Sequence, residues 1–137
     1  MSPRLSHLLE TSLYVADLDA SKAFYQRLFG FDVLLEDARM VGLQLPGSAV
    51  LLLFRKGAST KPSPTPGGLM PVHDTNGAQH LCLAIPADSL EGWERHLMLS
   101  GIAVESRAIQ THGGTSLYFR DLDGHSLELA TPGLWAN

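Results

Sequence analysis

The sequence has one cysteine, no long hydrophobic run and no excess of basic residues, and each shortage excludes a class of protein. Because Cys82 is the only cysteine, the chain can form neither an intramolecular disulfide nor a thiolate metal cluster. We interpret Cys82 as a small buried side chain. The longest apolar run, residues 49–54, is far shorter than the roughly 20 residues that span a bilayer. A membrane is therefore not expected as a partner.

Basic residues are few and scattered. Ten Lys and Arg stand against 14 Asp and Glu, which gives a formal net charge of −4. A nucleic-acid partner is therefore not expected, since such proteins carry a basic surface. Residues 1–9 lack the apolar stretch and the cleavage site of a secretory signal peptide. Together these features predict a cytoplasmic protein.

The chain does have enough apolar residues for a core. It is 137 residues long and 45% hydrophobic, a size that fits one domain or two small modules that share a core. We expect a single domain over residues 1–137. Within it we predict a first module over about residues 8–56, a linker over about 57–78 and a second module over about 79–135.

The first module alternates between strand and helix patterns. Residues 10–16 alternate as a strand does. Residues 17–29 carry apolar side chains at spacings of three and four and are followed by Gly30, which predicts an amphipathic helix that ends on glycine. Further strands are predicted over residues 31–37, 40–45 and 49–55.

The linker breaks this pattern with four prolines, at positions 62, 64, 66 and 71. Proline at alternate positions favours an extended chain, so the segment is predicted to cross the surface between the modules.

The second module repeats the first. It is predicted to contain a strand over residues 79–85, a helix over 88–100 and strands over 104–110, 115–120 and 126–131. Asp88 and Glu91 have capping-box spacing, and Gly101 is suited to end the helix. Each module is thus βαβββ, and at an offset of about 70 residues Glu10 falls on His80, which implies duplication.

The last strand carries one charge in an unexpected place. Its alternation puts Leu127 and Leu129 on one face and Ser126, Glu128 and Ala130 on the other. A carboxylate between two leucines is typical of a solvated sheet face. Small neighbours on the same face suit the lining of a concavity instead. These residues alone leave both interpretations open.

Three strings of the sequence are LYVADLDASKAFYQRLFGF, QHLCLAIP and SLYFRDLDGHSLELATPGLW. In this order and spacing they resemble the vicinal oxygen chelate superfamily, which includes glyoxalase I, bleomycin- and fosfomycin-resistance proteins and extradiol dioxygenases. The resemblance covers residues 8–135. It implies an α+β fold in which two βαβββ modules form an open, cup-like sheet with a divalent metal on its inner face. The metal could be Mn, Zn, Ni, Fe or Mg.

The resemblance also implies the metal ligands. Glu10 stands where many members have histidine, His80 matches the histidine that opens the second module, and Glu128 matches the carboxylate of the final strand. The fourth position that glyoxalase I uses corresponds to about Leu52, which cannot bind a metal, and this departure argues against glyoxalase I chemistry. Three ligands leave positions open for water or a bidentate substrate.

Further polar side chains share the inward parity and are candidate substrate contacts: Ser12, Ser116, Tyr118 and Arg120. The resemblance implies such contacts for Ser116 and Tyr118. The guanidinium of Arg120 could hold an anionic group or form a salt bridge at the rim.

The remaining histidines and the tryptophans are expected to have structural roles. His73 and His112 are expected in solvated loops, and His125 is expected to face outward. Trp93 and Trp135 are expected to be packing anchors.

Two functions fit this reading. The first is a metal-dependent enzyme of lyase, isomerase, transferase or dioxygenase type that chelates adjacent oxygens of a small substrate, with Glu10 or Glu128 serving as base. The second is a metal-free binding protein of the bleomycin-resistance kind. The resemblance also implies a homodimer.

Overall fold

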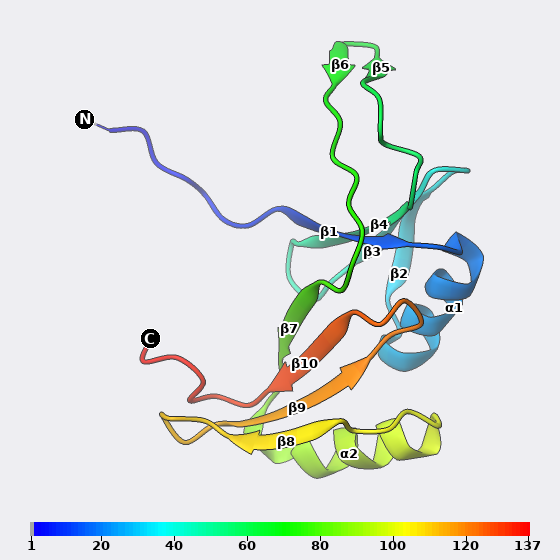
Figure 1. Cartoon of the computed structure of the whole chain (residues 1–137). Helices are drawn as coiled ribbons and strands as arrows, with labels where there is room; N and C mark the ends of the chain where they lie inside the picture. Colours follow the sequence, from blue (N-terminus) through cyan, green and yellow to red (C-terminus); the bar gives the residue numbers. More distant parts are fainter. Residues whose placement is uncertain (1) are drawn as a thin grey trace. The chain divides into compact units, whose positions relative to one another are not determined.

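The computed structural model describes residues 2–137. The chain divides into two compact units between Asn76 and Gly77, and each is described by itself. Each contains a βαβββ series (Figure 1). This mixed α+β architecture, with two four-stranded sheets, confirms the predicted fold class. That the two modules make one domain stays a prediction.

The first unit is built on a sheet with strand order β1-β4-β3-β2, in which β1 and β4 are parallel and the other pairs antiparallel. Its elements are β1 (Glu10–Val15), α1 (Leu18–Phe29), β2 (Asp32–Glu36), β3 (Met40–Gln44) and β4 (Val50–Arg55). All five agree with the prediction to within one residue at each end, which is the usual uncertainty of such bounds.

Helix α1 has the ends that its sequence predicts. Asp17 caps its start, where the carboxylate Oδ1 accepts a hydrogen bond from the Ala20 amide at 3.0 Å. Gly30 ends it with φ of 72°, a backbone angle that glycine adopts at little steric cost. The helix contacts β3 and β4. Its buried face, which includes Tyr25 and Leu28, covers the sheet face that carries Leu13 and Leu53.

The segment after β4, which was predicted as an extended linker, contains strands of its own. It contains a small hairpin of β5 (Ser63–Thr65) and β6 (Gly68–Met70). The Thr65 hydroxyl closes the turn by donating to the Gly68 carbonyl at 2.6 Å. The alternate prolines hold the chain extended as predicted, and they leave the intervening residues free to pair across the hairpin.

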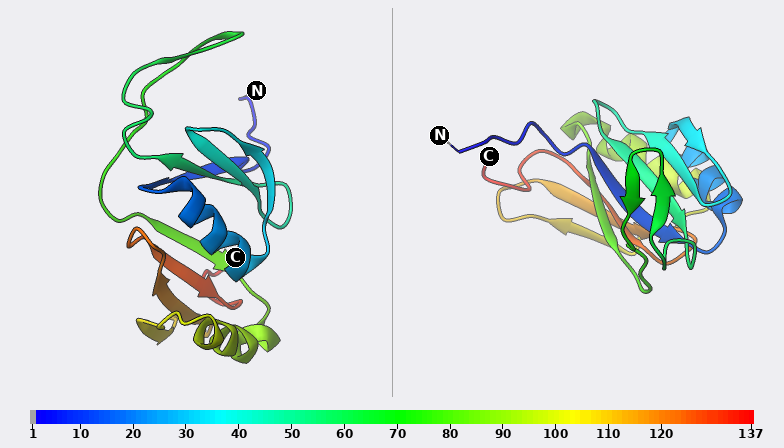
Figure 2. Two further views of the ribbon diagram at one scale, coloured as in Figure 1. Left: turned by 90° about the vertical axis from the view of Figure 1, so that its right-hand side faces the viewer. Right: turned by 90° about the horizontal axis from the view of Figure 1, so that it is seen from above.

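The second unit has a sheet of order β7-β10-β9-β8, with β7 and β10 parallel. Its elements are β7 (His80–Ala84), a short 3-10 turn (Ala87–Ser89), α2 (Leu90–Leu99), β8 (Ser106–Ile109), β9 (Thr115–Arg120) and β10 (Ser126–Ala130). Figures 1 and 2 show α2 on the β8 side of this sheet. The core lies on the face that carries Leu117, Phe119, Leu127 and Leu129, each at most 2% exposed.

The capping box predicted for Asp88 and Glu91 does not form. Pro86 starts a 3-10 turn, so Asp88 lies inside that turn and not at the helix boundary. The N-cap of α2 is Ser89, whose hydroxyl donates backwards to the Pro86 carbonyl at 2.8 Å. Gly101 does follow the helix, with φ of 73°. Within residues 2–137, neither helix has the length and hydropathy needed to cross a membrane.

Candidate functional site

The strand pairing of the second unit gathers polar side chains on the sheet face opposite Leu127 and Leu129. Glu128 lies across from Tyr118 on β9 and from Cys82 on β7, and Ser126 lies across from His80. Since paired residues of neighbouring strands point to the same side, these side chains share one surface. We call it the polar face. The residues that β7, β9 and β10 place on it are His80, Cys82, Ala84, Ser116, Tyr118, Arg120, Ser126, Glu128 and Ala130.

Glu128 is the centre of the polar face. It is only 4% exposed, so the interpretation of a solvated sheet face is wrong. One carboxylate oxygen, Oε1, lies 3.1 Å from His80 Nε2. The other, Oε2, accepts a hydrogen bond of 2.6 Å from the Ser116 hydroxyl. A buried carboxylate is expensive unless it is paired and hydrogen-bonded, and here both oxygens have a partner.

The hydrogen bonds of His80 indicate which of its two ring nitrogens carries a hydrogen. Nδ1 lies 2.9 Å from the backbone carbonyl oxygen of Ser126. A carbonyl can only accept, so Nδ1 must carry the hydrogen. A neutral ring then presents the Nε2 lone pair toward Glu128 Oε1. Two lone pairs 3.1 Å apart repel unless a proton or a cation lies near both.

This donor pair fits a divalent metal. Nitrogen and oxygen ligands bind zinc at about 2.0–2.2 Å, so two ligands of one cation lie about 3.0 to 3.5 Å apart for angles between a right angle and the tetrahedral angle, and the 3.1 Å observed falls in that range. Metal-binding histidines also donate their second N–H to a carbonyl or carboxylate, as His80 does to Ser126. No group of three or more His, Cys, Asp or Glu arranged for a metal occurs among residues 2–137. Of the three predicted ligands, the second unit contains His80 and Glu128, and their role as metal ligands stays a prediction.

Glu10 and Ser12 lie in the first unit, at the start of β1. Glu10 is exposed, and it shares a sheet face with Ser12 and Tyr14, opposite the buried Leu13. Leu52, the residue at the fourth family position, is paired with Ser12 and lies on that same face. The membership of Glu10 and Ser12 in one site with His80 and Glu128 stays a prediction.

Gln110 belongs to the polar network and was not anticipated. Its side-chain amide donates to the Ser116 hydroxyl oxygen at 2.8 Å and to the Tyr118 hydroxyl oxygen at 3.2 Å. Ser116 therefore accepts from Gln110 and donates its own hydrogen to Glu128. The Tyr118 oxygen is occupied in the same way, which leaves its O–H to donate elsewhere. In the sequence, Gln110 is the last residue of a predicted strand, and no motif marks it as a site residue.

Cys82 was interpreted as a buried residue, and this is wrong. It is exposed and lies on the polar face, because it shares strand parity with His80. Partial removal of the thiol from water, followed by the charge of Glu128 and a hydrogen bond to it, raises the pKa of Cys82 to about 12. The thiol therefore stays neutral at ordinary pH, and it serves as a hydrogen-bonding neighbour of the carboxylate.

Arg120 lies at the end of β9 and is held by groups outside the His80–Glu128 pair. Its Nε lies 3.1 Å from a Glu105 carboxylate oxygen, and Nη1 donates to the Gly124 carbonyl at 3.0 Å. This is the salt bridge that the sequence left open as an alternative. Its contact with a substrate stays a prediction.

Two histidine predictions need correction, and one agrees with the structure. His125 is fully buried rather than outward-facing, since its Nδ1 accepts the Gln79 amide at 2.9 Å. His73 is not a solvated loop residue: its Nδ1 lies 2.8 Å from the Tyr14 hydroxyl, and its ring packs edge-on against Phe54. His112 is exposed, as expected.

The two tryptophans were both predicted to be packing anchors, and the structure places them differently. Trp135 is 73% exposed, so it is not a terminal packing anchor. Trp93, on α2, is half-buried and packs edge-on against His96.

Comparisons with known proteins give matches over most of the chain. A family model described as Glyoxalase/Bleomycin resistance protein/Dioxygenase superfamily matches residues 4–129. The metallothiol transferase FosB of Bacillus licheniformis is 30% identical over 129 residues, which are 93% of this chain and 74% of that protein.

Among solved structures, lactoylglutathione lyase from Agrobacterium tumefaciens is 30% identical with a TM-score of 0.89, and the match covers 98% of this chain and 100% of that one. The fosfomycin resistance protein FosX from Listeria monocytogenes is 19% identical with a TM-score of 0.65, over 98% of this chain and 97% of that chain. At that identity FosX shows a shared fold only.

Proposed function

The chain belongs to the Glyoxalase/Bleomycin resistance protein/Dioxygenase superfamily, and from this premise we propose that it is a metal-dependent enzyme that acts on a small oxygenated substrate. His80, Glu128 and Glu10 would hold one divalent cation, with Mn, Zn, Ni, Fe and Mg as the candidates. One observation carries the proposal: Nε2 of His80 and Oε1 of Glu128 converge at 3.1 Å, while Nδ1 of the same ring is held by the Ser126 carbonyl.

A bound cation would polarise a substrate oxygen and stabilise the negative charge that develops on it. Every other part of the arrangement belongs to the chain. The Ser126 carbonyl orients the His80 ring, and the Ser116 hydroxyl fixes the carboxylate plane of Glu128. One histidine and two carboxylates would make a hard donor set, suited to cations that prefer oxygen ligands.

Tyr118 is the side chain of the polar face best placed to donate a hydrogen bond to a substrate oxygen. Its ring stacks near that of His80, with 6.4 Å between centroids, and Gln110 already donates to its oxygen. The hydroxyl of Ser116 is fully buried and engaged on both sides, so we assign it to positioning Glu128. Ser12 and Arg120 remain candidate substrate contacts, and Glu10 and Glu128 the candidate bases.

The test is the metal content of protein purified without added ions, measured by elemental analysis before and after dialysis against each candidate metal. We expect one divalent ion per chain in the wild type and loss of most of it in Glu128→Gln and His80→Gln. Glu105→Gln is the matched control, because Glu105 is a carboxylate of the same unit that pairs with Arg120.

Full occupancy in Glu128→Gln would show that the ligand assignment is wrong. A wild-type protein that takes up none of these metals would contradict the enzyme proposal. It would leave the metal-free binding protein as the function to be tested.

A further inference from the structure

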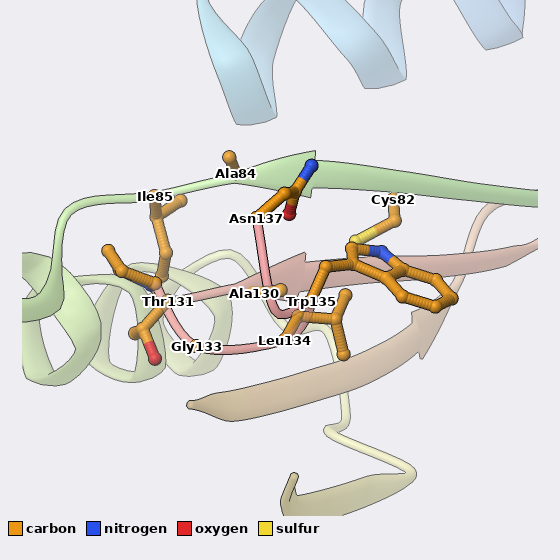
Figure 3. Close-up of a pocket in the computed structure, with 10 residues that line it drawn as sticks. Cys82, Ala84, Ile85, Ala130, Thr131, Gly133, Leu134, Trp135 and Asn137 are labelled. Atoms are coloured by element: carbon orange, nitrogen blue, oxygen red, sulfur yellow. The ribbon is translucent and has the colours of Figure 1, made fainter. Parts of the chain in front are cut away.

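A cavity of about 410 Å³ lies on the polar face beside Cys82, the strand partner of Glu128. Figure 3 shows the residues that line it. Its floor is made of the small side chains Cys82, Ala84 and Ala130. Its wall is the C-terminal segment, in which Leu134 and Trp135 fold back over that floor. We call this cavity the tail pocket. No Lys, Arg, Asp, Glu or His is among its lining residues.

The wall of the tail pocket is held in place by a contact between two glycines. A Cβ added to Gly114 would lie 2.8 Å from the Pro132 carbonyl oxygen, and one added to Gly133 would lie 2.8 Å from the His112 carbonyl oxygen. Only glycine permits so close an approach of two backbones. The adjacent Thr131 hydroxyl accepts the Thr115 amide at 2.8 Å. The tail therefore leaves β10 along a defined path.

The tail pocket adjoins the His80–Glu128 pair through Cys82. Cys82 forms part of its floor and is the strand partner of Glu128, so the pocket begins one side chain away from the carboxylate. Two alanines continue the floor away from the pair, and their small size is what leaves the space open. A molecule whose oxygens reach Glu128 would thus extend its remaining atoms over Ala84 and Ala130.

The walls indicate which chemical group would fill this space. Trp135 offers an indole that is 73% exposed, and aromatic rings gain from stacking on such a surface. A cavity of about 150 Å³ is enough to bind benzene, so the tail pocket has room for a substituted or fused ring. A charged group would find no ionised side chain of opposite sign among the lining residues, so the pocket favours an uncharged group.

We propose that the tail pocket binds the uncharged aromatic or alicyclic body of the substrate, while two adjacent oxygens of the same molecule meet the His80–Glu128 pair. This proposal rests on the proposed function for the oxygen contacts. The pocket itself can be tested without a metal. The substrate class is then a ring compound with neighbouring oxygen functions, not a small aliphatic aldehyde or acid.

The first experiment titrates ¹⁵N-labelled, metal-free protein with 2-naphthol, a neutral ring without adjacent oxygens, and follows the backbone and indole N–H signals. We expect the largest shifts at Cys82, Ala84, Ala130 and Trp135. Ala84→Leu fills the floor from an exposed position, and Trp135→Ala removes the wall. Each should weaken binding at least tenfold. Ile109→Ala, which removes another exposed apolar side chain of this unit, should leave it unchanged.

The second experiment compares 2,3-dihydroxynaphthalene with catechol on metal-loaded protein by calorimetry. We expect the larger ring to bind at least tenfold more tightly, and we expect Ala84→Leu to abolish that advantage while catechol still binds. Three results would overturn the proposal for the tail pocket. They are no binding of 2-naphthol, signal shifts at residues outside the pocket, and wild-type affinity in both Ala84→Leu and Trp135→Ala. If the protein gave one of these results but still bound the metal and catechol, the proposed function would stand without the tail pocket.

Discussion

Ser116 is a fully buried hydroxyl whose hydrogen bond to Glu128 is the shortest contact of the polar network. Replacing Ser116 with Ala leaves Oε2 of a buried carboxylate without its donor. An unsatisfied buried group costs about 1–3 kcal/mol, and more when it is charged. We expect Ser116→Ala to lower the free energy of unfolding by at least that amount and to weaken metal binding, as measured by urea denaturation and by metal titration.

Ser106→Ala is the control for this substitution, because Ser106 is an exposed serine on β8 of the same sheet. It should change both quantities little. Equal stability of Ser116→Ala and Ser106→Ala would mean that the Ser116 contact adds nothing to the fold.

Cys82 gives a prediction for pH in the metal-free protein. Its pKa is raised to about 12, above the roughly 8.5 of a cysteine in an unfolded chain. The unfolded state therefore releases the thiol proton first as pH rises, and the folded state loses stability relative to it. The stabilisation is complete below about pH 8 and is lost between about 8.5 and 12.

The measurement is denaturation of the wild type and Cys82→Ala at pH 7, 9 and 10.5. The wild type should lose more stability than the variant as pH rises. Alkylation of Cys82 by iodoacetamide should also stay slow at pH 9, since the thiolate is the reactive form. Rapid alkylation at pH 8 would contradict the raised pKa.

At the scale of elements, the contact between the β8–β9 loop and the C-terminal segment is the most sensitive point of the second unit. A Cβ at Gly114 would meet two carbonyl oxygens at 2.8 and 2.9 Å, and neither belongs to a flexible side chain. Overpacking of this kind costs about 1–3 kcal/mol. Gly114→Ala should therefore destabilise the protein in thermal unfolding and weaken 2-naphthol binding, because the tail moves.

Gly92→Ala is the matched control. Gly92 lies within α2 and has nothing within 4 Å of an added Cβ. Alanine is about 1 kcal/mol more favourable than glycine inside a helix, so this substitution should stabilise the protein. If Gly114→Ala raised the melting temperature as well, the close approach of the two backbones would not constrain the tail.

The elements could be predicted from the sequence where one face of each is buried. The alternation in residues 10–15 and 126–130 follows directly from a sheet with one core face, and both strands were placed correctly. Predictions failed where a local contact outweighed the pattern. Pro86 shifted the start of α2, and the Gln79 amide drew His125 inward. Gln79 lies 46 positions from His125 along the chain, so the pattern of neighbouring residues does not reveal that contact.

At the scale of the whole molecule, the oligomeric state is the open prediction. The family resemblance implies a homodimer, and the chain mass is 14.8 kDa. Sedimentation velocity at micromolar concentration should show a species of about twice that mass, as expected for a closed pair with two-fold symmetry. A single species of the chain mass at every concentration would make the protein a monomer.

The candidate site was predictable in part. Strand parity and the family resemblance identified His80 and Glu128, and the structure brings these two within hydrogen-bonding distance. Gln110 and Cys82 could not be found in this way. Gln110 acts through two residues six and eight positions away, and the exposure of Cys82 depends on which side of β7 is covered. The tail pocket depends on Gly114 and Gly133, whose proximity appears only in the folded chain.

The anchor of His80 has a genetic consequence. The group that receives its Nδ1 hydrogen is a main-chain carbonyl of β10, and every amino acid at position 126 would supply one. No missense change at that position can delete the acceptor, so the orientation of the ring depends on the register between β7 and β10. Mutational scanning should therefore find position 126 permissive to residues other than proline, which would lose the N–H bond to the Gln79 carbonyl, beside two intolerant neighbours. A shift in the register of β7 against β10 would remove the acceptor from His80 Nδ1, whereas the loss of a side chain at position 126 would not.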